Sequence, residues 1–159
     1  MNYYFTDETV TSYDLISDIM AKPDFMHFTR KRRTMMTIWP NFIRHPGYKL
    51  EEQVVCVVVG QETFKIVGPA YKQHIYSGVF EKYDPDISPV DFFRDNLEHF
   101  PLVKAAKMYT VVLNPGDCLY IPSFWWSQSQ STGSRKTRMF TQEFESSSKL
   151  AGMFISMLD

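Results

Sequence analysis

The sequence contains few of the residues that build disulfide frameworks and metal clusters. Among its 159 residues are two cysteines, Cys56 and Cys118, and four histidines. Both cysteines lie within apolar runs that look like strands. We therefore expect two buried thiols, and neither a disulfide framework nor a zinc site.

Long apolar runs and an excess of one charge are also lacking. The longest uninterrupted apolar run, residues 54–59, is far shorter than the roughly 20 residues of a membrane span. The formal net charge is -1, so no global field attracts nucleic acid or anionic lipid. The opening residues, MNYYFTDE, have no basic n-region and no Arg-rich pattern. We expect an intracellular chain without a cleaved leader, and mitochondrial import by an internal signal stays open.

Aromatic residues, by contrast, are frequent, at 16% of the chain. A core so rich in rings is typical of a β-rich domain. The length fits one domain with a sizeable core, and the sequence has no repeat and no linker. We expect a single domain over 1–159, with a helix at about 13–21, a barrel at about 34–145 and a helix at about 147–158.

The spacing of apolar residues predicts a succession of short strands. These strands are expected at residues 34–39, 53–59, 62–67, 108–113, 118–122 and 137–145. Gly60 and Gln61 predict a hairpin turn, residues 88–98 have the capping pattern of a short helix, and the polar stretch 127–134 predicts an exposed loop. Short strands flanked by helices favour a mainly β fold, either a small barrel or a double-sheet jelly roll.

The most specific segment spans residues 111–126 and reads VVLNPGDCLYIPSFWW. It resembles the PGD-x-LYIP-x-x-WW signature of the JmjC-type cupin hydroxylases, a group that includes the asparaginyl hydroxylase factor inhibiting HIF. Residues 53–69 and 98–101 resemble two further pieces of that family. The resemblance covers about residues 34–145 and implies a double-stranded β-helix, the cupin barrel.

The resemblance also implies where a metal and a cosubstrate would be held. Enzymes of this family bind Fe(II) through two histidines and one carboxylate, which leaves positions open for 2-oxoglutarate and O2. The ligand positions fall on Gly47, Lys49 and Ser127, and the lysine that pairs with 2-oxoglutarate falls on Glu62. Glycine offers no ligand, serine is a poor one, lysine brings a cation, and glutamate repels an anionic cosubstrate. The resemblance thus implies a pseudoenzyme, without catalytic residues, metal or cofactor.

From these departures we expect a structural or protein-interaction module, such as an accessory subunit of a larger complex. One alternative is an Fe(II)/2-oxoglutarate-dependent protein hydroxylase with unorthodox ligands. His45 is the candidate for a shifted ligand, although it precedes Pro46 and Gly47 and is expected in a loop. Another alternative is a metal-free cupin that holds a small ligand.

Two further expectations concern contacts. Lys49 and Glu62 have opposite charges and flank one cavity in the family's pattern, so we expect them to form an ion pair. The pocket of a metal-free cupin would be lined by Trp126, Tyr109 and Tyr120.

An apolar stripe near the C-terminus is the candidate interface. Its members recur at the i, i+3, i+4, i+7 and i+8 spacing of one helix face, and they are Leu150, Met153, Phe154, Met157 and Leu158. Such a stripe packs either on its own barrel or on a protein partner or second copy. The near-neutral charge argues against nucleic acid as the partner, despite the basic cluster at residues 30–33.

Overall fold

The computed structural model describes residues 4–5, 31–39, 46–79, 87–94, 98–131 and 137–145. Most of the predicted barrel lies within these ranges. The two predicted helices, at 13–21 and 147–158, lie outside them, and so do His45 and the C-terminal apolar stripe.

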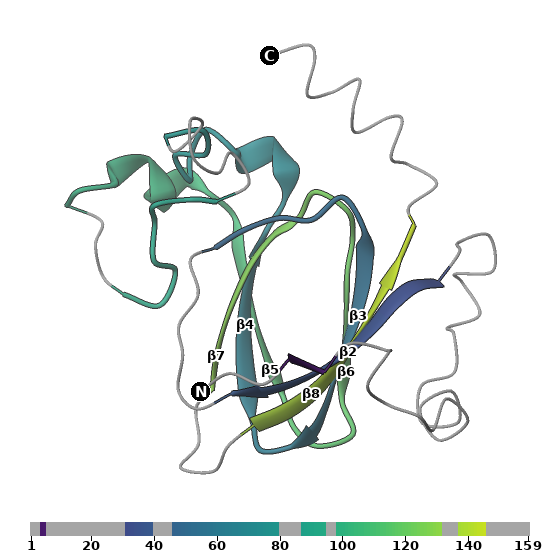
Figure 1. The fold of residues 1–159 in the computed structure, drawn as a ribbon. Helices are drawn as coiled ribbons and strands as arrows, with labels where there is room; N and C mark the ends of the chain where they lie inside the picture. The colour runs from purple at the N-terminus through teal and green to yellow at the C-terminus, as the bar shows by residue number, and fades with distance from the viewer. Residues whose placement is uncertain are drawn as a thin grey trace.

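The described strands form two antiparallel sheets that face each other (Figure 1). The larger sheet has the order β1-β2-β8-β3-β6, with β1 at Tyr4–Phe5, β2 at Lys31–Trp39, β8 at Thr137–Phe144, β3 at Glu52–Val59 and β6 at Cys118–Ile121. The smaller sheet has the order β5-β4-β7, with β5 at Met108–Leu113, β4 at Glu62–Val67 and β7 at Trp126–Ser131. The mainly β, double-stranded β-helix predicted from the sequence is confirmed.

The space between the two sheets is filled with apolar side chains. Every second residue of a strand points to the same face, and the inward positions carry a buried cluster drawn from both sheets. Its members are Val55, Val57, Phe64, Ile66, Leu113, Ile121 and Met139. Burial of each such aliphatic or aromatic side chain stabilises the fold by about 1.5–3 kcal/mol. The middle of the barrel is therefore a packed core.

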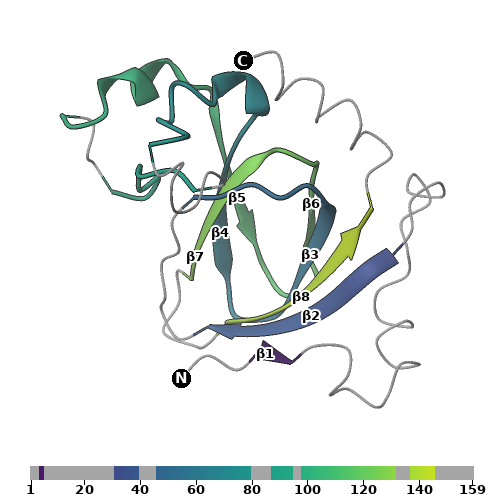
Figure 2. The same cartoon turned by 45° about the horizontal axis from the view of Figure 1, so that its top comes forward.

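The chain between β4 and β5 forms an outer layer on the smaller sheet, which Figure 2 shows beside β4. It includes two 3-10 helices, η2 at Pro69–Tyr71 and η3 at Pro101–Ala105. Its apolar residues form a second buried cluster with the outward face of β4 and β7: Val67, Ile75, Val90, Phe92, Val103 and Trp126.

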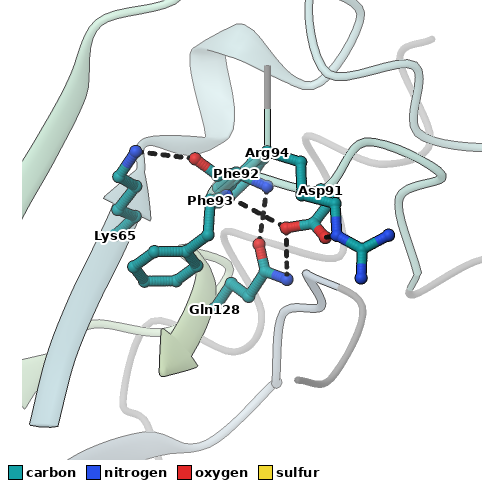
Figure 3. Close-up of polar contacts among 6 residues, drawn as sticks. All are labelled: Lys65, Asp91, Phe92, Phe93, Arg94 and Gln128. Carbon is teal, nitrogen blue, oxygen red and sulfur yellow. Dashed lines mark hydrogen bonds and ion pairs between the residues drawn. The ribbon is translucent and has the colours of Figure 1, made fainter. Parts of the chain in front are cut away.

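Polar contacts attach this outer layer to the sheet (Figure 3). The buried amide of Gln128 on β7 accepts a hydrogen bond from the Phe92 N–H at 2.6 Å and donates one to Asp91 at 3.1 Å. From β4, the Lys65 ammonium donates to the Phe92 carbonyl at 2.7 Å. Two neighbouring strands thus hold the same stretch of loop.

This attachment explains one difference from the sequence-based prediction. The expected helix over 88–98 is wrong for the part that the structure describes, residues 87–94 and 98, which forms bends and turns. The Asp91 carboxylate accepts from the Phe93 N–H at 3.0 Å, but it also binds Gln128 and Arg94. These contacts to the side chains around it hold the backbone as a turn.

Two further expectations, a hairpin at Gly60 and Gln61 and an exposed loop from residue 127, were wrong. Gly60 and Gln61 do not close a hairpin, since β3 belongs to the larger sheet and β4 to the smaller one. The stretch expected as an exposed loop from residue 127 is strand β7 as far as Ser131, paired along its whole length with β4. Its polar residues gave no hydrophobic alternation, because Gln128 faces the outer layer and the serines face the barrel.

The cysteines also differ from the expected pair of buried thiols. Cys56 on β3 lies directly opposite Cys118 on β6, and the two form a disulfide. Cys118 is exposed and Cys56 is partly buried. The two cysteines are 62 residues apart in the sequence, and only the register between β3 and β6 brings them together.

Gly60 tests the turn at which the chain passes from the larger sheet to the smaller one. It has a φ of +87°, and an added Cβ would lie 2.8 Å from Thr137 Oγ1 and 2.9 Å from Thr137 Cα. Gly116 has a similar φ of +95° but open space around it. We expect Gly116→Ala to cost about 1 kcal/mol for its backbone strain alone, and Gly60→Ala to cost at least about 2 kcal/mol more. Urea unfolding of both variants measures the difference, and equal losses would contradict the close packing of β8 on this turn.

Candidate functional site at the barrel mouth

One end of the barrel brings two of the predicted site positions together. Gly47 and Ser127 form an isolated antiparallel bridge, with the Ser127 N–H donating to the Gly47 carbonyl at 2.9 Å and the Gly47 N–H donating to the Ser127 carbonyl at 3.2 Å. Ser127 also lies opposite Ile66, an inward residue of β4. We call this end, next to the start of β7, the mouth.

The third predicted position, Lys49, holds an ion pair at the mouth. Its ammonium contacts the carboxylate of Glu143 on β8, and Gln53 on β3 donates to the same carboxylate oxygen at 3.2 Å. The Glu143 side chain is only 4% exposed, whereas that of Lys49 is 38% exposed. The Lys49 backbone is fixed as well, because its carbonyl accepts from the Phe124 N–H at 2.8 Å.

Sequence reasoning missed Glu143 and Gln53. A signal was present for Glu143, because it is separated by even numbers of residues from Met139 and Thr141 on β8 and so lies on the inward face. Gln53 lies directly opposite Glu143 in the register. An acidic residue at an inward position of a strand marks a partner to be found.

Glu62 lies at the other end of the barrel. It is the first residue of β4, opposite Ser131, whereas Ser127 is opposite Ile66. Its side chain is 2% exposed, and Oε2 has no hydrogen-bond partner among the described residues. Burial raises the pKa of Glu62 from its ordinary value of 4.5 to about 7, against a smaller lowering by hydrogen bonds with Ser129 and Thr137.

The expected ion pair between Lys49 and Glu62 is therefore wrong. Four residues of strand separate Glu62 from the level of Ser127, which is about 13 Å at the usual rise. The apolar cluster between the sheets fills the interval. The lysine instead pairs with a carboxylate at its own end of the barrel.

The three aromatic residues expected to line one pocket lie in different places. Tyr120 is on the outer face of the larger sheet, where its hydroxyl donates to Glu52 at 2.9 Å. Trp126 is buried in the outer layer, and Tyr109 packs near Trp125 at 6.1 Å between ring centroids. Trp125, the neighbour of Trp126 in the sequence, packs against the interior cluster.

The residues at the mouth do not fit an Fe(II) facial triad. Gly47 has no side chain, Ser127 offers a hydroxyl, and Lys49 presents an ammonium that would repel a dication. Among the residues that the structure describes, no group of three His, Cys, Asp or Glu side chains is placed to hold a metal ion. We therefore derive no reaction step through iron.

Comparison with known proteins decides the family. The model of the cupin-like domain family matches residues 45–146. The chain belongs to this family. Jumonji C domain-containing protein 5 of Drosophila melanogaster is 31% identical over 84 residues, covering 53% of this chain and 21% of that protein. JmjC domain-containing protein D of Dictyostelium discoideum is 29% identical over 79 residues, covering 50% of this chain and 18% of that protein.

A solved structure, that of E. coli ycfD, is similar with a TM-score of 0.49 and 18% identity, covering 80% of this cupin-like chain and 29% of that one. The chain spans about a fifth of the length of the two curated relatives. Within the described residues, no helix is long and apolar enough to cross a membrane.

The family match corrects one expectation. The prediction that the chain is not an enzyme is wrong, because the cupin-like family and the JmjC-named relatives indicate an enzyme-type fold. Four departures from a motif do not establish that a cupin-like domain lacks activity. What the mouth does show is an ion pair at a position where the resemblance implies a metal ligand.

The raised pKa of Glu62 predicts a pH-dependent stability. In the folded state the carboxyl holds its proton up to about pH 7, whereas in the unfolded state it ionises near 4.5. The wild type therefore loses stability as the pH rises from about 4.5 to 7. Glu62→Gln is expected to match the wild type at pH 5 and to exceed it by about 2–3 kcal/mol at pH 8.

Urea unfolding across this pH range measures the effect, with the exposed Glu98→Gln as the matched control. A Glu62→Gln advantage that does not grow with pH would contradict the buried, neutral carboxyl.

The Lys49–Glu143 pair predicts strong coupling. Lys49→Met leaves a buried carboxylate without its cation and is expected to cost about 1–2 kcal/mol, since part of the lysine is open to water. The double variant Lys49→Met/Glu143→Gln should recover most of that loss in a double-mutant cycle. Arg94→Met, which breaks the exposed pair with Asp91, should cost less than about 0.5 kcal/mol. Additive losses at Lys49 and Glu143 would contradict the ion pair.

Proposed function

We propose that this JmjC/cupin-like domain works as a protein-interaction module, an accessory subunit of a larger complex, and that its mouth holds the Lys49–Glu143 ion pair in place of Fe(II). The observation that carries the proposal is the Lys49–Glu143 ion pair at the mouth. We propose an intracellular location for this function.

The ion pair supports this proposal by its charge and by its burial. A dication placed beside Gly47 and Ser127 would meet the Lys49 ammonium at short range, where the interior strengthens Coulomb repulsion. Removing the lysine from that place would strand the buried Glu143 carboxylate, which costs more than the pair itself contributes. The folded state thus favours a mouth without a metal ion.

The other end of the barrel supports the same conclusion. The resemblance assigns Glu62 to the position of the lysine that pairs with 2-oxoglutarate. Above about pH 7 this side chain is an anion, and it would repel a dicarboxylate. The apolar cluster separates Glu62 from the polar residues at the mouth.

The partner surface proposed is the apolar stripe near the C-terminus, Leu150, Met153, Phe154, Met157 and Leu158. Its spacing predicts one apolar face of a helix, and an exposed apolar face of this kind marks an interaction site. A protein partner or a second copy of the chain would cover it.

Iron content and cosubstrate turnover test the proposal. We expect purified protein to carry far less than one iron per chain after incubation with Fe(II). One retained iron per chain, or succinate that depends on both iron and 2-oxoglutarate, would favour the alternative of a hydroxylase with unorthodox ligands.

The triple variant Gly47→His/Lys49→Asp/Ser127→His supplies the missing ligand set as a positive control. If the three positions converge on one site, the folded variant should take up Fe(II) where the wild type does not.

A further inference from the structure

The disulfide between Cys56 and Cys118 lies at the edge of the larger sheet. β6 is the edge strand, and it pairs with β3 through the register Gln53↔Ile121 to Cys56↔Cys118. The Cα atoms of the two cysteines are 4.1 Å apart. Both side chains point away from the barrel, because the residues next to them, Val55, Val57 and Leu119, belong to the interior.

The two sulfurs differ in their access to solvent. Cys118 is exposed, whereas Cys56 is partly buried against an apolar cluster that contains Val54 and Phe144. Exchange requires that an attacking thiolate reach one sulfur while the other leaves. Attack from solvent is therefore directed to Cys118, and Cys56 is the leaving sulfur.

Hydrogen bonds add to the disulfide in holding β6 beside β3. At the turn before β6, the Val57 N–H donates to the Asp117 carbonyl at 3.0 Å and the Gly116 N–H donates to the Val57 carbonyl at 2.8 Å. At the other end of the strand, Tyr120 donates to Glu52. After reduction these hydrogen bonds alone hold β6, so the strand becomes looser while the two cysteines stay near enough for the bond to form again.

The strand that carries Cys118 continues into the mouth. β6 ends at Ile121, and three residues later the Phe124 N–H binds the Lys49 carbonyl. Phe124 has a φ of +63°, a backbone conformation that persists only when its surroundings enforce it. A loosened β6 thus removes support from the segment that fixes Lys49.

We propose that Cys56–Cys118 is a reversible thiol–disulfide exchange site for dithiol reductants, and that its reduction loosens β6 and the adjoining mouth. The thiolate of the reductant attacks Sγ of Cys118, the S–S bond breaks, and Cys56 leaves as a thiolate that takes a proton. The second thiol of the reductant attacks the mixed disulfide and releases Cys118 as a thiol. Two electrons pass to the protein, and the reductant becomes a disulfide.

Native-state reduction with dithiothreitol, followed by alkylation and mass spectrometry, tests the site. We expect both cysteines of the folded wild type to become alkylated, and oxidised glutathione to restore the bond. With a monothiol and rapid alkylation to trap the released thiol, the mixed disulfide should be found on Cys118 and the alkyl group on Cys56. Cysteines that react only after denaturation, or a mixed disulfide found mainly on Cys56, would overturn the proposal.

Hydrogen exchange by mass spectrometry tests the structural consequence. Reduction should speed amide exchange several-fold in β6 and in residues 122–126, and leave β4 unchanged. The double variant Cys56→Ser/Cys118→Ser should show the reduced pattern and no response to dithiothreitol, which separates the effect of the bond from side reactions. Equal exchange in β6 before and after reduction would overturn the link to the mouth.

Discussion

The apolar packing between the two sheets is the interaction on which the rest of the structure depends. Seven buried side chains from five strands fill the barrel, and their burial stabilises the packing of the two sheets against each other. This filling divides the polar groups of the interior into two sets. Lys49, Glu143 and Gln53 meet at the mouth, and Glu62 stays among hydroxyls at the far end.

That division explains how one fold can keep its scaffold while the chemistry of its ends changes. The turn, strand and tryptophans of residues 111–126 serve the packing, since Leu113, Ile121 and Trp125 contribute to the interior cluster. The polar side chains at the mouth and at the far end are not members of that cluster, so the cluster does not depend on their identity. In this chain an ion pair lies at the mouth and a buried carboxyl at the far end.

Elements with local sequence signals could be predicted, whereas contacts between distant segments could not. Strands at β3, β4, β5, β6 and β8 were evident because apolar alternation and turn residues are local signals. β7 was missed because its polar side chains pack inside the barrel and against Asp91. The strand exchange at Gly60, the disulfide and the Lys49–Glu143 pair all depend on the register between distant segments. No local pattern carries that register.

Diffraction from crystals grown with excess Fe(II) and 2-oxoglutarate, measured at the iron absorption edge, tests the central claim most directly. The account predicts no anomalous peak beside Gly47 and Ser127, and a Lys49 ammonium that remains against the Glu143 carboxylate. An iron peak at the mouth, with Lys49 displaced from Glu143, would contradict it.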